Sequence, residues 1–141
     1  MVCLVVGWGM DWSRSWPILP AIRWYAPRVA LSGALILFGL GLIGYCARQF
    51  ERAQTPIVPR RPTSSIITKG PYRYSRNPIY LGFAISAVGI ALAFNSCWML
   101  LSVLAFVLIA NKLAIEREEE YLEGKFGESY SNYRRRTRRW L

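Results

Sequence analysis

Histidine is absent from this chain of 141 residues, and cysteine is scarce, with only Cys3, Cys46 and Cys97. The absence of histidine removes the usual general base and the commonest metal ligand. The three cysteines are far apart, each in or beside an apolar run, and none forms a CxxC pair or a zinc spacing. The sequence therefore predicts buried free thiols, no disulfide and no metal site.

Acidic residues are also few, because 8 Asp and Glu stand against 18 Lys and Arg and leave a formal net charge of +10. Hydrophobic residues nevertheless make up 53% of the chain, since they come in long runs with the charges between them. Such a charge could serve nucleic-acid binding, attraction to a membrane surface, or membrane topology. The apolar runs favour the two membrane explanations, so we expect a lipid bilayer and no nucleic acid as partner.

Three apolar runs predict the fold class. Residues 29–47 are uncharged and long enough to cross a bilayer, and their small residues favour close helix packing. Residues 79–94 and 97–110 are separated only by Asn95 and Ser96, a turn tight enough for a helical hairpin, and the last helix continues into the charged stretch 116–123. We therefore expect an all-α, polytopic transmembrane helix bundle with three long spanning helices.

The two ends of the chain complete this expectation. Residues 1–28 are apolar, aromatic and broken by prolines, which predicts a short or partial N-terminal helix. Gly124 and Gly127 are expected to break the last helix, so that the tail folds back as a short amphipathic helix with apolar contacts from Tyr121, Phe126, Tyr130 and Tyr133. Residues 1–141 are expected to form a single membrane-embedded domain, with 66–141 as its functional core.

The basic residues indicate how the bundle is oriented. The loop 48–76 and the tail 116–141 carry most of the Lys and Arg, whereas the turn at Asn95 carries none. An even number of crossings separates the loop from the tail, so both lie on one side, and the charge bias makes that side cytoplasmic. Arg23 and Arg28 on the opposite side count against this orientation. The expected location is a multi-pass protein with loop 48–76 and the tail in the cytoplasm.

Two polar clusters meet the membrane on that side. In KGPYRYSRNPIYLG, residues 69–82, Asn77 and Pro78 suit an N-cap and a first helical residue. The tyrosines among the arginines there are explained either by interface anchoring or by a binding site. In IEREEEYLEGKFGESYSNY, residues 115–133, helical geometry at about 100° per residue points Glu118 toward the bundle. Its neighbours Glu116, Glu119, Glu120 and Glu123 are expected to face solvent.

Together, GPYRYSRNPIYLG and EREEEYLEGKFGESYSNYRRRTRRWL resemble the isoprenylcysteine carboxyl methyltransferase and phospholipid methyltransferase superfamily over residues 66–141. The resemblance implies an S-adenosylmethionine site at the cytoplasmic ends of the last two long helices, with no single residue assigned as catalytic. It implies that the cofactor is lined by Ile66, Ile67, Tyr72, Asn77, Pro78, Ile79, Tyr80 and Glu118. Glu119, Leu122, Phe126 and Gly127 complete the second motif, and Glu119 is counted with the cofactor-binding residues that the resemblance implies.

The chemistry of these residues suits that cofactor. The carboxylate of Glu118 can pair with a cation, tyrosine faces attract a sulfonium or stack on adenine, and Arg73 or Arg76 can bind a carboxylate. Methyl transfer depends mainly on holding donor and acceptor in line, so neither a metal nor a histidine is needed. A site at the membrane boundary would let a hydrophobic or lipid-like substrate approach from the bilayer.

The sequence departs from the family pattern at two positions and leaves alternatives open. Asn77 replaces the family histidine, and Ala114 stands where the eukaryotic prenylcysteine enzymes have a substrate-binding arginine, which weakens a prenylcysteine substrate. An NAD(P)H-dependent membrane reductase on a related helical scaffold is the first alternative. A non-catalytic membrane protein that retains the motifs for folding is the second.

Overall fold

The computed structural model describes residues 2–13, 17–19, 25–53 and 66–141 of the chain. Within these residues all regular secondary structure is helical, and β-pairing is limited to isolated bridges. This confirms the all-α prediction. The elements are α1 (Val2–Ser13), α2 (Tyr25–Arg52), the 3-10 turn η1 (Gly70–Arg73), α3 (Pro78–Ala93), α4 (Cys97–Ala110), the π-helical turn η2 (Asn111–Ile115), α5 (Glu116–Phe126) and α6 (Glu128–Arg136).

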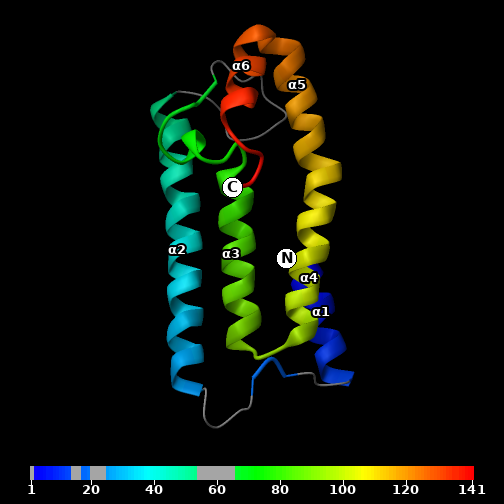
Figure 1. Ribbon diagram of the computed structural model, residues 1–141. Helices are drawn as coiled ribbons and strands as arrows, with labels where there is room; N and C mark the ends of the chain where they lie inside the picture. Colours follow the sequence, from blue (N-terminus) through cyan, green and yellow to red (C-terminus); the bar gives the residue numbers. More distant parts are fainter. Residues whose placement is uncertain (1, 14–16, 20–24, 54–65) are drawn as a thin grey trace.

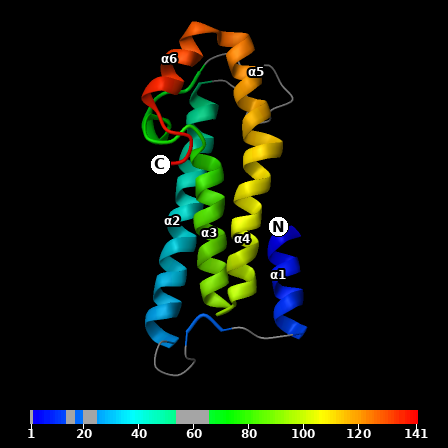
Figure 2. The same cartoon turned by 45° about the vertical axis from the view of Figure 1, so that its right-hand side comes forward.

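The helices form an elongated bundle in which α2, α3 and α4 run side by side in alternating directions (Figures 1 and 2). The short α1 packs against α4 near the end where α3 and α4 are joined. Large apolar side chains such as Leu37, Phe38, Leu104 and Leu108 are exposed along the outer faces of the bundle. This surface suits lipid rather than water as the surrounding solvent.

Two continuous helices are long and apolar enough to cross a membrane: α2, and the helix Cys97–Phe126 that combines α4, η2 and α5. The expectation of three long spanning helices therefore holds for two of them. The third, α3, is apolar but has only 16 residues, or about 24 Å of helix, because it begins at Pro78 and ends at the Asn95 turn. With 12 residues, α1 matches the expected short N-terminal helix.

Small residues allow α2 and α3 to approach closely. A Cβ atom added at Gly82 would lie 2.7 Å from Cγ1 of Ile43 and 2.9 Å from the carbonyl oxygen of Gly39. A Cβ atom at Gly39 would in turn collide with the hydroxyl of Ser86. The glycines therefore fit this seam because no side chain can be accommodated between the two backbones, as is usual where helices pack inside a bilayer.

The end of the bundle at the α3–α4 turn is closed by paired polar groups. Asn95 adopts φ 55°, and its side chain exchanges two hydrogen bonds with the backbone of Leu19, at 2.9 and 3.0 Å. The Nη1 group of Arg28 donates to the carbonyl oxygens of Leu92 and Ala93 at 3.0 and 3.1 Å. Arg28 thus satisfies the last carbonyls of α3, which accounts locally for a cation at this end.

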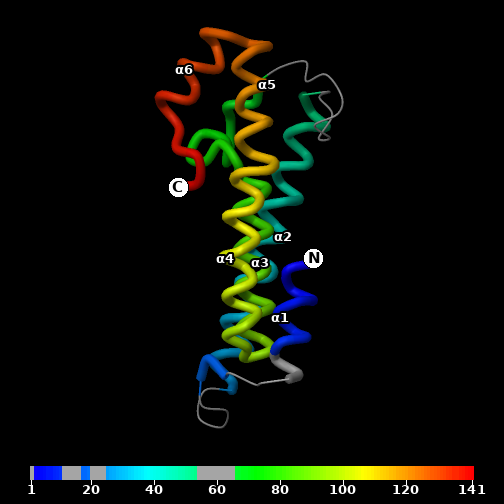
Figure 3. Tube along the Cα trace, turned by 90° about the vertical axis from the view of Figure 1, so that its right-hand side faces the viewer, coloured from blue at the N-terminus to red at the C-terminus, as the bar shows by residue number. Residues whose placement is uncertain are grey.

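At the opposite end, α4 continues through η2 into α5, and the chain reverses at Gly127, where φ is 52° (Figure 3). The expected break at Gly127 and the returning helix are confirmed, whereas Gly124 lies within α5 and breaks nothing. Tyr130 is buried, and the hydroxyl of Tyr133 donates to the carbonyl oxygen of Tyr72 at 2.7 Å. Tyr121 is 43% exposed, and Nζ of Lys125 lies 5.7 Å from the centroid of its ring.

Candidate functional site

The two polar clusters of the sequence lie together at the end of the bundle opposite the Asn95 turn. The segment 66–77 folds over the ends of α2 and α3, while α5 and α6 stand beside it (Figure 1). A bridge between Ser75 and Arg138 joins this segment to the C-terminal tail. Residues from both motifs and from the tail can therefore contribute to one site.

Helix α3 begins at this site as the sequence predicts, with Asn77 at the N-cap position and Pro78 as the first helical residue. The side chain of Asn77 makes no capping hydrogen bond, so the capping role itself is wrong. Its Nδ2 group donates instead to the carbonyl oxygen of Arg139 at 3.1 Å. The backbone N–H of Asn77 donates to the hydroxyl of Ser75 at 3.1 Å. Asn77 therefore connects the start of α3 to the C-terminal tail.

A cavity of about 170 Å³ opens between α2, α3 and α5. It brings together seven of the predicted site residues, Tyr72, Arg76, Asn77, Pro78, Ile79, Tyr80 and Glu118. Its volume is below the roughly 300–1,000 Å³ of a complete small-molecule site. The cavity that the described residues form is therefore smaller than a complete cofactor site.

Four predicted residues are not among those that line the cavity. Ile66 and Ile67 are half-buried in the segment before η1, and the side chain of Arg73 is exposed at the end of η1. Glu119 is buried, but it faces away from the cavity into a cluster of arginines. Of the two arginines proposed to bind a carboxylate, Arg76 is therefore the one at the cavity.

Two charged groups at the cavity are not fully paired within the described part of the chain. Glu118 makes no hydrogen bond or ion pair there. It lines the cavity, in agreement with the prediction that its side chain points toward the bundle. The side chain of Arg76 is only 10% exposed, and its Nε and Nη1 atoms are buried without a hydrogen-bond partner. Unpaired buried polar groups are costly, so Arg76 is suited to bind a ligand that supplies the missing acceptors, and the half-buried Glu118 offers a carboxylate at the same cavity.

Tyr72 contributes a neutral ring to the wall of the cavity. Its hydroxyl lies near the thiol of Cys46 in α2, and its ring meets that of Phe50 edge-on with centroids 5.8 Å apart. Burial raises the pKa of the Tyr72 hydroxyl far above its ordinary value, and the nearby Cys46 acts in the same direction. Tyr72 therefore stays protonated, and it offers the cavity an aromatic surface rather than a base.

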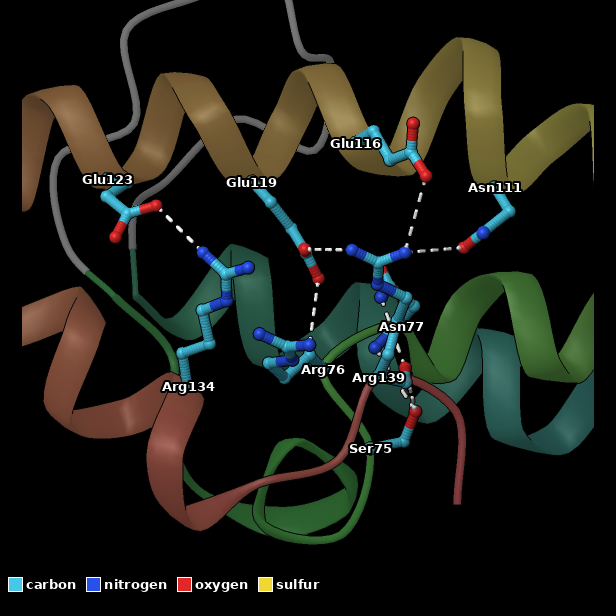
Figure 4. A network of polar contacts seen from close by, with 9 residues as sticks. All are labelled: Ser75, Arg76, Asn77, Asn111, Glu116, Glu119, Glu123, Arg134 and Arg139. Carbon is cyan, nitrogen blue, oxygen red and sulfur yellow. Dashed lines mark hydrogen bonds and ion pairs between the residues drawn. The ribbon is translucent and has the colours of Figure 1, made fainter.

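The expectation that Glu119 faces solvent is wrong. Its side chain is 7% exposed and lies between Arg76, at 3.2 Å from Nη2, and Arg139, at 2.7 Å from Nη2 (Figure 4). Helical geometry grouped Glu116, Glu119 and Glu123 correctly on one side of α5. That side is covered because α6 and the tail fold back along it, and Glu123 pairs there with Arg134 at 2.8 Å.

The C-terminal tail holds the first motif through its backbone and through Arg139. The carbonyl oxygen of Arg138 accepts the N–H of Arg76 at 2.9 Å, and that of Arg139 accepts the hydroxyl of Ser75 at 3.3 Å. The Arg139 side chain also donates to Oδ1 of Asn111 at 3.2 Å and lies 3.6 Å from Glu116. The hydrogen bond to Glu119 raises the pKa of Arg139, so its guanidinium remains charged.

Sequence reasoning missed three residues of the site. Phe50 and Phe83 line the cavity. Phe83 lies four residues after Ile79, so helical spacing could have found it, whereas Phe50 lies in α2, outside both motifs. Arg139 carries no such local signal, because its contacts depend on the tail returning to α5. Within the described residues, no group of three or more His, Cys, Asp or Glu could hold a metal ion.

An apolar helical bundle with a polar, aromatic-lined cavity at one end is typical of a membrane protein with a candidate ligand site. The chain belongs to the phospholipid methyltransferase family, which it matches over residues 27–129, well over half of its length. This match includes the first motif and the second motif as far as residue 129. The resemblance predicted from the sequence is therefore confirmed.

Two similar proteins were found. The chain is 38% identical over 63 residues to an uncharacterised protein of Haemophilus influenzae, a match that covers 45% of this chain and 100% of that protein. It is also 38% identical over 75 residues to the protein-S-isoprenylcysteine O-methyltransferase of Schizosaccharomyces pombe, covering 51% of this chain but 30% of that enzyme. No solved structure matches the chain. The family and the second relative support a membrane methyltransferase activity.

Proposed function

We propose that this protein transfers a methyl group from S-adenosylmethionine to a hydrophobic or membrane-associated acceptor. One observation carries the proposal: the cavity combines an unpaired carboxylate, Glu118, with a guanidinium, Arg76, that has two buried nitrogens without a hydrogen-bond partner. The amino-acid end of the cofactor carries an ammonium and a carboxylate, which are the complementary charges. Charge-assisted hydrogen bonds of this kind are about twice as strong as neutral ones.

The aromatic residues of the cavity support the same ligand. Phe50, Tyr72, Tyr80 and Phe83 all line it, and aromatic faces attract cations such as a sulfonium or stack on an adenine ring. The cofactor would supply an activated methyl group. The chain's own residues would bind its charges, exclude water and hold donor and acceptor in line, which accounts for activity without a general base. Asn77 would act through neutral hydrogen bonds where the family has histidine.

The position of Phe83 supports an acceptor that arrives from the bilayer. Its side chain is 49% exposed on the apolar helix α3, yet it also lines the cavity. The cavity therefore borders the outer apolar surface of the bundle, where a lipid-like molecule could approach sideways. We further propose a single multi-pass domain with loop 48–76 and the tail in the cytoplasm, because most of the cations lie there.

Ligand-dependent thermal stability tests the cofactor. Protein purified in detergent should gain thermal stability with S-adenosylmethionine or S-adenosylhomocysteine and not with NADPH, because a ligand stabilises only the state that binds it. Stabilisation by NADPH alone would favour the reductase alternative. Stabilisation by neither class would favour a non-catalytic role.

A transfer assay then identifies the acceptor. The protein would be incubated with methyl-labelled S-adenosylmethionine and a total lipid and prenyl-compound extract, and the labelled species would be separated. Label should appear in an extractable hydrophobic compound, and the Glu118→Gln variant should transfer far less. Label confined to water-soluble products would contradict a membrane-associated acceptor.

A further inference from the structure

We propose that Arg139, in the C-terminal tail, is a positioning residue that keeps Arg76 free to bind the anionic end of the ligand. The inference rests on the proposed function, because it concerns the same cavity. Arg139 does not line the cavity itself. It acts through Glu119, the buried carboxylate that separates the two guanidinium groups (Figure 4).

The geometry of Glu119 is unequal toward its two arginines. Oε2 accepts a hydrogen bond from Arg139 at 2.7 Å, whereas Oε1 lies 3.2 Å from Nη2 of Arg76 without the alignment of a hydrogen bond. Glu119 therefore interacts more strongly with Arg139 than with Arg76. Arg76 is restrained on one side by an ion pair, but most of its hydrogen-bonding capacity is unused.

The charge balance explains why two arginines are needed. Arg76 and Glu119 alone would form a neutral buried pair, and a neutral pair has little attraction for an anion. With Arg139 added, the buried groups Arg76, Glu119 and Arg139 carry one net positive charge close to the cavity, which the nearly half-exposed Glu116, 3.6 Å from Arg139, offsets only in part. Since Glu118 places a negative charge in the same cavity, this excess helps an anionic group to bind beside it.

The tail backbone places Arg139 with little freedom. The carbonyl oxygens of Arg138 and Arg139 accept hydrogen bonds from Ser75, Arg76 and Asn77. The residues on both sides of the Arg76 side chain are thus tied to the same two residues of the tail. The other tail arginines lack this arrangement: Arg134, for example, forms an ion pair with Glu123 in which both side chains are nearly half exposed.

Two ligands that differ in their amino-acid part test the proposal. S-adenosylhomocysteine carries the carboxylate, whereas 5′-methylthioadenosine keeps the adenosine and the thioether but has no amino-acid part. Full-length protein in detergent would be titrated with each ligand by calorimetry. Arg139→Gln keeps a hydrogen-bond donor for Glu119 and removes the charge, and it should bind S-adenosylhomocysteine about tenfold more weakly. Its affinity for 5′-methylthioadenosine should be unchanged.

Two further variants provide the controls. Arg139→Lys restores the charge and should recover most of the affinity for S-adenosylhomocysteine, while Arg134→Ala should change neither affinity. Equal loss of both ligands in Arg139→Gln, or no loss of either, would overturn the proposal and leave the tail a structural role. If the unmodified protein binds neither ligand, the proposed function fails and this inference fails with it. If the unmodified protein binds both ligands and Arg139→Gln loses both equally or loses neither, only this inference is rejected and the proposed function stands.

Discussion

The two ends of the bundle use polar groups in opposite ways. At the α3–α4 turn, Asn95 exchanges both of its side-chain hydrogen bonds with Leu19, and Arg28 binds the last carbonyls of α3. At the cavity, Glu118 has no partner within the described residues, and two nitrogens of Arg76 are buried without one. At the first end the polar side chains find their hydrogen-bond partners within the protein, and they stabilise the fold. At the second end some polar side chains lack partners, which costs stability and is expected where a ligand completes the site.

The largest effect is expected at the satisfied end. Asn95→Ala removes two side-chain hydrogen bonds and forces a positive φ on a residue that disfavours it, so it should lower the free energy of unfolding by about 3 kcal/mol. Asn95→Gly tolerates the φ and should lose about half as much. Thermal or denaturant unfolding in detergent measures both. Affinity for S-adenosylhomocysteine should be unchanged in the folded fraction, and a selective loss of affinity would contradict the comparison.

Glu118→Gln should have the next largest effect, and it should act on binding rather than folding. Loss of a charge-assisted contact predicts about 30-fold weaker binding of S-adenosylhomocysteine, or about 2 kcal/mol. The unliganded protein should be as stable as before or more so, because a desolvated charge is removed. Glu120→Gln, on the exposed side of α5, is the matched control and should bind normally. Equal effects of the two substitutions would mean that the predicted role of Glu118 is wrong.

Arg28→Met should produce a smaller loss, again at the satisfied end. It keeps an unbranched side chain but removes the guanidinium donor from the carbonyl oxygens of Leu92 and Ala93, of which Leu92 retains the N–H of Asn95, at a cost of about 1 kcal/mol. A thermal shift assay in detergent should detect the change with and without ligand to the same extent. A ligand-dependent difference would show that the two ends are energetically coupled.

Arg134→Ala should have the smallest effect of the series. Its ion pair with Glu123 is close, at 2.8 Å, but both side chains are nearly half exposed. Such pairs contribute less than about 1 kcal/mol, and the contribution falls as salt is added. Unfolding measured at low and high salt should show a loss below about 0.5 kcal/mol that disappears at high salt. A large, salt-independent loss would place Arg134 with the buried network instead.

The parts of the fold that were predicted from sequence depend on local signals. Pro78 marks the start of α3, the Asn95–Ser96 pair turns the chain, and Gly127 reverses it where φ is positive. Each signal acts within a few residues, so it can be recognised without knowing the rest of the fold. The length of α3 could not be judged in the same way, because its ends are decided by these neighbouring turns rather than by its apolar run.

The site was predicted only where one helix or one motif determines the outcome. Helical geometry placed Glu118 toward the bundle, and it lines the cavity together with most of the first motif. The same geometry grouped Glu119 with Glu116 and Glu123 but could not show what covers that side of α5. That side is covered by the C-terminal tail, in which Arg139 contacts Glu119 across 20 residues. A contact at this separation produces no helical periodicity that could be recognised in the sequence.

The π-helical turn Asn111–Ile115 has a consequence for how this helix tolerates change in length. A π turn accommodates one residue more than the α-helix it interrupts. Deleting a single residue there would let the chain relax into an uninterrupted α-helix in which the residues beyond keep nearly the same direction. Deleting a residue from α4 instead would rotate everything beyond by about 100°, so that Glu118 would leave the aromatic wall and Glu119 its arginines. The turn is therefore the place in this helix where the loss of one residue would preserve the orientation of the acidic motif.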